Sequence, residues 1–202
     1  MILQRASSRS AAFALVAASL IAASTQASDA QAAPSRAASK VTLEFVKNAK
    51  DPSNSSLRVY NAGKFVTKYR AGSGLGTTAD YKTKAGKRYR NDCASKAGWL
   101  PNGTYRPTSF QTNRDSDIKG YAIGLPNKEC QAGGVNRTAL FIHSEMTKDR
   151  KQGPKKGADS PRRWDGDVDY KSWGCIKLNP YDIARLFSYM NRHGRAASLT
   201  VR

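Results

Sequence analysis

The chain has 202 residues, with 34 Lys and Arg against 15 Asp and Glu, which gives a formal net charge of +19 at pH 7. This length suits one domain with a substantial core and is short for two, and a hydrophobic fraction of 39% argues against a collagen or a coiled coil. The excess of positive charge predicts an anionic partner, and nucleic acid, an anionic membrane or an acidic polymer would each qualify.

The N-terminal segment has the features of an export signal. Arg5 and Arg9 precede an uncharged apolar run over 11–23, which is too short to span a bilayer because a helix needs ~20 residues for that. Ala30-Gln31-Ala32 then fits the pattern of small residues at a signal-peptidase site. Cleavage is expected after Ala32, with Ala27 and Ala30 as alternative positions. The competing interpretation is an amphipathic core helix.

This interpretation sets the domain organisation. We expect a signal peptide over 1–32, a flexible lead-in over 33–40 and a single domain over 41–202. Cleavage removes two arginines and one aspartate, so the mature protein keeps a net charge of +18. The sequence after residue 32 contains no second long apolar stretch, so we expect a secreted protein without membrane insertion.

Export would place the three cysteines in an oxidising compartment, where thiols tend to pair. Three pairings are possible. Cys93 and Cys130 both lie in polar, turn-rich sequence, whereas Cys175 enters the apolar run that follows Gly174. We therefore predict a disulfide between Cys93 and Cys130 and a free thiol at Cys175.

Strand patterns dominate the mature chain. Alternation of apolar and polar residues predicts a strand over 41–46 and a hairpin over 57–69. The glycine-rich stretch 71–76 lacks the helix and lysine of a phosphate-binding loop, and is expected to be a flexible strand exit. Further strands are expected after the Pro101-Asn102-Gly103 turn and at 121–125 and 138–142.

One helix is predicted near the C-terminus. Asn179 is a favourable N-cap, Pro180 suits the first helical position, and Gly194 is suited to end the helix. Between them, apolar residues recur at the spacing of one helical face. A last strand is expected over 198–201, so the fold class is mainly β with one helix.

Candidate catalytic residues are few because the chain has two histidines. His193 lies near the helix C-terminus, where a structural role is sufficient, whereas His143 ends an apolar strand. Cys175 opens another short apolar run. A cysteine nucleophile requires a base or a positive field, which His143 provides if the fold joins the two strand ends. The alternative is a buried free cysteine and an unrelated histidine.

The segment Ser172-Trp173-Gly174-Cys175-Ile176-Lys177-Leu178, with His143-Ser144 upstream, resembles the L,D-transpeptidase (YkuD-type) catalytic domain. The hairpin, the glycine-rich exit, the turn at 101–105, the helix and the final strand follow in the family's order, so the resemblance extends over about 41–202. Two residues depart from the family pattern. Trp173 replaces a usual histidine, and Lys177 stands where arginine or asparagine is usual.

The resemblance implies an L,D-transpeptidase-like β-sandwich with a long lid loop before the cysteine motif, and no metal or cofactor. Cys175 would be the nucleophile and His143 the base, with Ser144 orienting the imidazole through its hydroxyl or carbonyl group. The backbone N–H groups of Gly174 and Cys175 would bind the oxyanion. Further substrate contacts would come from the flanking residues Ser172, Trp173 and Lys177.

The implied reaction is attack on the third residue of a peptidoglycan tetrapeptide stem, with loss of the terminal D-amino acid. Transfer to an amine of another stem gives a 3-3 crosslink, and transfer to water makes the enzyme an L,D-carboxypeptidase or endopeptidase. A non-catalytic basic wall-binding protein is the alternative from another class. We expect a monomer in the cell envelope that binds stem peptides and anionic wall polymers. Nucleic acid is not expected, because recognisable binding signatures are missing.

The charged segment 145–171 is interpreted either as the lid over the groove or as a solvated loop. Within it Asp165, Asp167 and Asp169 alternate like the start of a calcium loop. Tyr170 and Ile176 occupy the positions where such a loop needs glycine and glutamate, which weakens that alternative.

Overall fold

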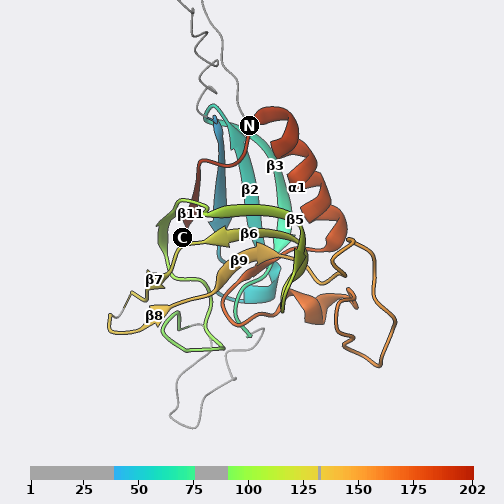
Figure 1. Ribbon diagram of the computed structural model, residues 1–202. Coiled ribbons are helices and arrows are strands. Elements are labelled where there is room, and N and C mark those ends of the chain that lie inside the picture. The colour runs from blue at the N-terminus through green and yellow to red at the C-terminus, as the bar shows by residue number, and fades with distance from the viewer. Residues whose placement is uncertain (1–38, 76–90, 132) are drawn as a thin grey trace, which may run out of the picture. The chain divides into compact units, whose positions relative to one another are not determined.

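A computed structural model describes residues 39–75, 91–131 and 133–202 (Figure 1). Most regular elements are strands, namely β1 (Val41–Val46), β2 (Ser55–Asn61), β3 (Lys64–Ala71), β4 (Gly103–Tyr105), β5 (Ser109–Asp115), β6 (Lys119–Leu125), β7 (Lys128–Glu129), β8 (Asn136–Arg137), β9 (Leu140–His143), β10 (Ile176–Lys177) and β11 (Ser198–Val201). The helices are α1 (Pro180–His193) and the short 3-10 turns η1 (Pro52–Asn54) and η2 (Asp167–Tyr170). The fold is mainly β with one α-helix, as predicted.

The larger sheet has the strand order β3-β2-β1-β11-β4. The predicted hairpin forms β2 and β3, and β11 lies parallel to β1 with Leu43 opposite Leu199. Alternate side chains of β1 are buried, as expected for a strand with one face on the core. This sheet therefore supplies one wall of the core.

The smaller sheet has the order β10-β9-β6-β5, and in Figure 1 its strands run crosswise to β2 and β3. Strand β9 is central, because Ile142 lies opposite Ile123 on β6 and opposite Ile176 on β10. All three isoleucines are fully buried and belong to the same core cluster as β1 and β2. The two sheets thus enclose one apolar core.

Helix α1 begins and ends as the sequence predicts. The side chain of Asn179 accepts a hydrogen bond from the backbone N–H of Asp182 at 2.8 Å, and Gly194 ends the helix at a φ of +98°. Phe187 on its buried face lies 4.5 Å, between ring centroids, from Tyr121 of β6. The helix is thereby packed against the smaller sheet.

The glycine-rich stretch after β3 differs from the prediction. Gly72, Ser73 and Gly74 are buried, and Gly72 exchanges backbone hydrogen bonds of 3.0 and 2.9 Å with Lys177. Gly74 accepts another from the N–H of Ser172 at 3.0 Å. Residues 76–90 lie outside the described residues. The described part of the stretch is therefore a docked support for the segment around Cys175, and not a flexible exit.

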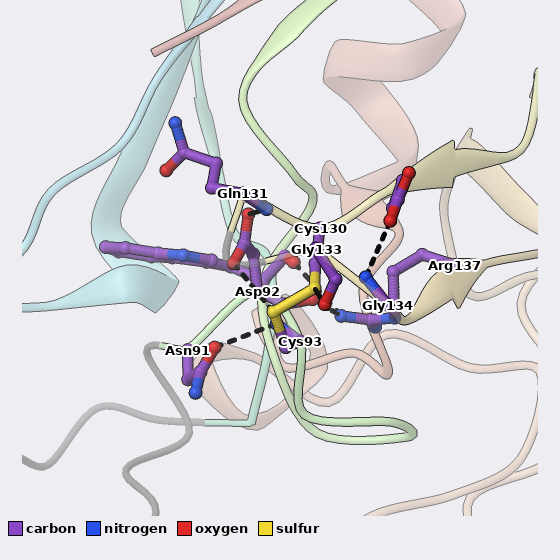
Figure 2. The surroundings of a disulfide bond; sticks show 10 residues. Asn91, Asp92, Cys93, Cys130, Gln131, Gly133, Gly134 and Arg137 are labelled. Atoms are coloured by element: carbon purple, nitrogen blue, oxygen red, sulfur yellow. Dashed lines mark hydrogen bonds between the residues drawn. A yellow bond between two sulfur atoms is a disulfide. The ribbon is translucent and has the colours of Figure 1, made fainter.

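The cysteines pair as predicted. Cys93 and Cys130 form a disulfide with an S–S distance of 2.01 Å, and Cys175 is free (Figure 2). The neighbouring Asp92 carboxylate accepts a 3.1 Å hydrogen bond from the N–H of Gln131, on the far side of the disulfide. Both contacts tie the loop 91–100 to the end of β7.

The double variant Cys93→Ser/Cys130→Ser is expected to unfold more easily, because the bond closes a loop with a sequence separation of 37 residues. Loop-closure entropy for that length corresponds to about 4 kcal/mol. Urea denaturation without reductant measures the loss, and wild type treated with reductant should reproduce it. A double variant as stable as oxidised wild type would contradict the expectation.

No helix within the described ranges is long and apolar enough to cross a membrane. The predicted signal peptide over 1–32 lies outside these ranges.

Candidate active site

Strand pairing brings Cys175 and His143 to one face of the smaller sheet. His143 is the last residue of β9 and lies opposite Lys177 of β10, while Cys175 immediately precedes β10. Side chains two residues apart on a strand share a face, so Cys175 projects on the same side as Lys177 and His143. All three line a groove of about 850 Å³. The two candidate catalytic residues are thus brought together by a parallel strand pair.

The thiol of Cys175 is protonated at neutral pH. Burial raises its pKa to about 11, while a hydrogen bond from the backbone of Phe141 and the charges of Lys177 and Arg137 act in the opposite direction. The thiol also approaches the carbonyl oxygen of Ala139, at 3.5 Å. A thiolate therefore forms only when a base takes the proton or the environment changes.

The imidazole of His143 is held by the main chain. Its Nδ1 lies 3.1 Å from the carbonyl oxygen of Ser144, and a carbonyl only accepts, so Nδ1 carries the hydrogen and Nε2 keeps a free lone pair. The hydroxyl of Ser144 is buried and has no hydrogen-bond partner in the described structure. Of the two possibilities open for Ser144, the carbonyl makes the contact.

Burial also lowers the pKa of His143 to about 3, and the nearby charges of Lys177 and Arg114 lower it further, against a raising contribution from the Ser144 contact. The imidazole is therefore neutral at neutral pH. A neutral imidazole with a free Nε2 is the form that accepts a proton.

This depressed pKa predicts acid sensitivity. The unfolded chain binds a proton at His143 near pH 6.5 and the folded chain only near pH 3, so the stabilisation is complete above pH 6.5 and is lost as the pH falls towards 3. Between pH 7 and 4 the free energy of unfolding should fall by about 3 kcal/mol more in wild type than in His143→Gln. Urea titrations at each pH measure this, with His193→Gln as the matched loss of an exposed histidine. Parallel wild-type and His143→Gln curves would refute it.

Ser172 organises the loop before the thiol. Its hydroxyl accepts hydrogen bonds from the N–H groups of Gly74 and Gly174, both at 3.2 Å, and donates one of 2.6 Å to the carbonyl of Cys175. The N–H of Gly174, predicted to bind the oxyanion, is therefore engaged by Ser172 in this structure. Ser172 acts on the backbone of the loop from a buried position.

Lys177 and Trp173 occupy opposite environments. Lys177 is buried and forms an ion pair with Glu145, which also lines the groove. The side chain of Trp173 is 65% exposed at the groove, with the ammonium of Lys96 5.7 Å from its ring centroid. The residue that replaces the family's usual histidine thus forms an exposed aromatic surface beside Cys175.

The segment 145–171 contributes to the groove wall through Glu145, Asp159, Val168, Asp169 and Lys171. Part of it also borders a second cavity of about 510 Å³, which meets the groove at His143. The segment therefore forms part of the groove wall, as the lid alternative requires.

The three aspartates of the calcium-loop alternative bind protein groups instead. Asp165 accepts from the N–H of Ser160 at 2.6 Å, and Asp167 pairs with Arg70 at 2.7 Å. Asp169 accepts from the N–H groups of Asp165 and Gly166. These carboxylates hold the segment in shape.

Elsewhere in the described part of the chain, one group of potential metal ligands comprises Asp92, Cys93 and Cys130. Its two sulfurs are joined in the disulfide.

Sequence analysis missed Arg137. Its side chain is 4% exposed, and its guanidinium donates hydrogen bonds to the carbonyls of Asp92, Gly98, Trp99 and Trp173. It stands in a polar run just before β9 and belongs to the two-residue strand β8, so no periodicity distinguishes it. Its contacts depend on segments that are distant in the sequence and come together only in the fold.

The family model described as the L,D-transpeptidase catalytic domain, YkuD, matches residues 50–196. The mainly β fold and the cysteine–histidine groove agree with that class of enzyme. The chain belongs to the YkuD family of L,D-transpeptidase catalytic domains.

Solved structures resemble the chain at low sequence identity. They include Bd1075 of Bdellovibrio bacteriovorus (11% identity, TM-score 0.42, 81% of this chain and 48% of that one) and an L,D-transpeptidase of Mycobacterium smegmatis (16%, 0.39, 80% and 59%). L,D-transpeptidase 1 of Mycobacterium tuberculosis is another (13%, 0.36, 80% and 62%). The chain thus spans about half to three fifths of these proteins. None of the curated proteins compared with it matches.

Proposed function

We propose that the protein is an exported, cysteine-dependent L,D-transpeptidase that acts on peptidoglycan stem peptides and forms 3-3 crosslinks. One observation carries the proposal: Cys175 and His143 project from neighbouring parallel strands into one groove. Membership of the L,D-transpeptidase family gives this pair its reaction class.

In the first half-reaction, Nε2 of His143 takes the thiol proton as Sγ of Cys175 attacks the carbonyl of the third stem residue. The bond to the terminal D-amino acid breaks, and its amine receives the proton from His143. The product is a thioester on Cys175. The backbone N–H of Cys175 is the proposed oxyanion donor, and one such donor contributes ~3 kcal/mol in comparable sites.

In the second half-reaction, an amine of another stem attacks the thioester while His143 takes its proton. The carbon–sulfur bond then breaks, and the proton returns to the sulfur. If water attacks in place of the amine, the same residues perform carboxypeptidase or endopeptidase chemistry. The neutral state of both side chains at rest means that proton transfer accompanies attack.

Two further observations support the proposed location. The Cys93–Cys130 disulfide is consistent with an oxidising compartment. The excess of lysine and arginine would retain the protein on anionic wall polymers in a salt-dependent manner.

The test is to incubate the purified protein with disaccharide-tetrapeptides and to identify the products by mass spectrometry. Crosslinked dimers that have lost one D-residue support transpeptidation, whereas tripeptides alone assign the enzyme as a carboxypeptidase. Tight binding of wall polymers without any product would overturn the enzymatic proposal and favour the non-catalytic wall-binding protein.

A further inference from the structure

Arg137 lies where three segments of the chain meet, beside the loop that carries Cys175. Its Nη2 donates to the carbonyls of Trp173 at 2.8 Å and Gly98 at 3.3 Å. Its Nη1 donates to the carbonyls of Asp92 and, at 3.4 Å, Trp99. A single buried guanidinium therefore binds the loop 91–99 and the loop before Cys175 at the same time.

The acceptors are main-chain carbonyls, which leave the positive charge of Arg137 without a contacting carboxylate among the described residues. The carboxylate of Asp92 interacts with this charge without an ion-pair contact, and it accepts its hydrogen bond from the N–H of Gln131 (Figure 2). Burying a guanidinium in this way is costly unless its hydrogen bonds are satisfied, and the carbonyls satisfy them. Its charge thus remains available to a neighbouring anion.

The approach of Arg137 to the loop is close. Gly174 has a φ of +121°, and a Cβ built on it would overlap Nη2 of Arg137. The backbone conformation therefore favours glycine before Cys175, and a side chain at this position would displace the guanidinium. The guanidinium of Arg137 thus lies directly beside the Trp173–Gly174 peptide group, just before Cys175.

We propose that Arg137 is a positioning residue for Cys175: it fixes the Trp173–Cys175 loop on the disulfide-anchored loop 91–99 and supplies a positive charge where the thiolate forms. The thiolate role of Cys175 rests on the proposed function, whereas the contacts of Arg137 do not.

Most of the other cations that line the groove bind a carboxylate or an aromatic ring. Lys177 is paired with Glu145, Arg114 lies over the ring of Phe141 at 4.6 Å, and Lys96 lies over Trp173. The remaining charged or titratable groups that line the groove are His143, Asp117, Asp159, Asp169 and Lys171. Among the cations, Arg137 and Lys177 are those that favour the Cys175 thiolate.

The Cys93–Cys130 disulfide joins the two segments that the Arg137 hydrogen bonds also connect. Cys93 follows Asp92, whose carbonyl binds Arg137, and Cys130 lies in the connection between β7 and β8, the strand that carries Arg137 (Figure 2). The disulfide therefore links the loop 91–99 covalently to the segment that carries Arg137, a few residues from their hydrogen bonds.

The test compares alkylation of Cys175 by neutral iodoacetamide and anionic iodoacetate, because a positive charge beside the thiolate favours the anionic reagent. Arg137→Gln keeps an amide donor and loses the charge, and Arg137→Lys keeps the charge and loses the planar fork. The ratio of iodoacetate to iodoacetamide rates should fall about three- to tenfold in Arg137→Gln and stay within about twofold of wild type in Arg137→Lys. Arg114→Met is the matched loss of another groove cation.

A purely structural role would change both reagents equally in both variants, and an unchanged ratio in Arg137→Gln would overturn the proposal. If Arg137→Gln does not fold, Arg137→Lys decides, since a ratio more than about threefold below that of wild type overturns the proposal. Peptide mapping confirms that only Cys175 reacts. The assay requires no peptidoglycan, so its failure is distinct from failure of wild type to process disaccharide-tetrapeptides.

Discussion

Cys175→Ala should abolish product formation from disaccharide-tetrapeptides, with a loss of at least about a thousandfold in turnover. Alanine has no nucleophilic atom, so neither a thioester nor any route through it remains. Within the described part of the chain the thiol hydrogen-bonds to backbone groups of Ala139 and Phe141, so the variant should keep a wild-type melting temperature to within a few degrees. Mass spectrometry of the products and thermal denaturation of the same sample measure both effects.

The two histidines provide a matched control for this result. His143→Ala should reduce turnover by about a hundredfold or more, because it removes the proposed base, whereas His193→Ala removes an exposed side chain at the end of α1. Turnover in Cys175→Ala above a hundredth of wild type, with the variant folded, would refute the assignment of the nucleophile.

Gly72→Ala is expected to destabilise the protein by about 2–4 kcal/mol and to lower turnover as well. A Cβ at this position would overlap the carbonyl oxygen of Tyr170, and it would lie 2.8 Å from the Cβ of Tyr170. Relief requires movement of the backbone that also exchanges hydrogen bonds with Lys177, two residues after the nucleophile. Urea denaturation and the product assay should therefore report the loss together.

Gly134→Ala is the control for an alanine replacement at glycine. Gly134 has a φ of +78° and open space where the Cβ would stand, so only the backbone conformation is strained, at about 1 kcal/mol. The free energy of unfolding should fall less than in Gly72→Ala, with normal turnover. Equal losses in the two variants would show that the contact with Tyr170 has no effect.

The elements found from the sequence are those in which local pattern and burial agree. Strand β1 alternates buried and partly exposed residues, and α1 has its cap and its apolar face in sequence order. Strand β5 was missed because most of its residues are polar and all are partly or fully exposed, which gives no alternation. The parallel pairs β1–β11 and β9–β10 join distant segments, and nothing local to either strand specifies its partner.

The site shows the same division. Cys175 and His143 are recognisable because Cys175 opens an apolar run and His143 ends one, each within a short motif. The hydrogen bonds of Ser172 to Gly74 and of Arg137 to Asp92 connect residues far apart in sequence. Ser144 contacts the imidazole of His143 through its backbone carbonyl, which every residue has. The identity of its side chain therefore could not predict this contact.

The position of β11 has a consequence for the order in which the protein can be assembled. This strand is formed by residues 198–201, yet it lies between β1 and β4 inside the larger sheet. Until residues near 201 have left the ribosome, β1 has one empty edge, and β4 has no partner in its sheet. The part of the larger sheet formed by β3, β2 and β1 therefore joins β4 only once β11 is available to pair with both.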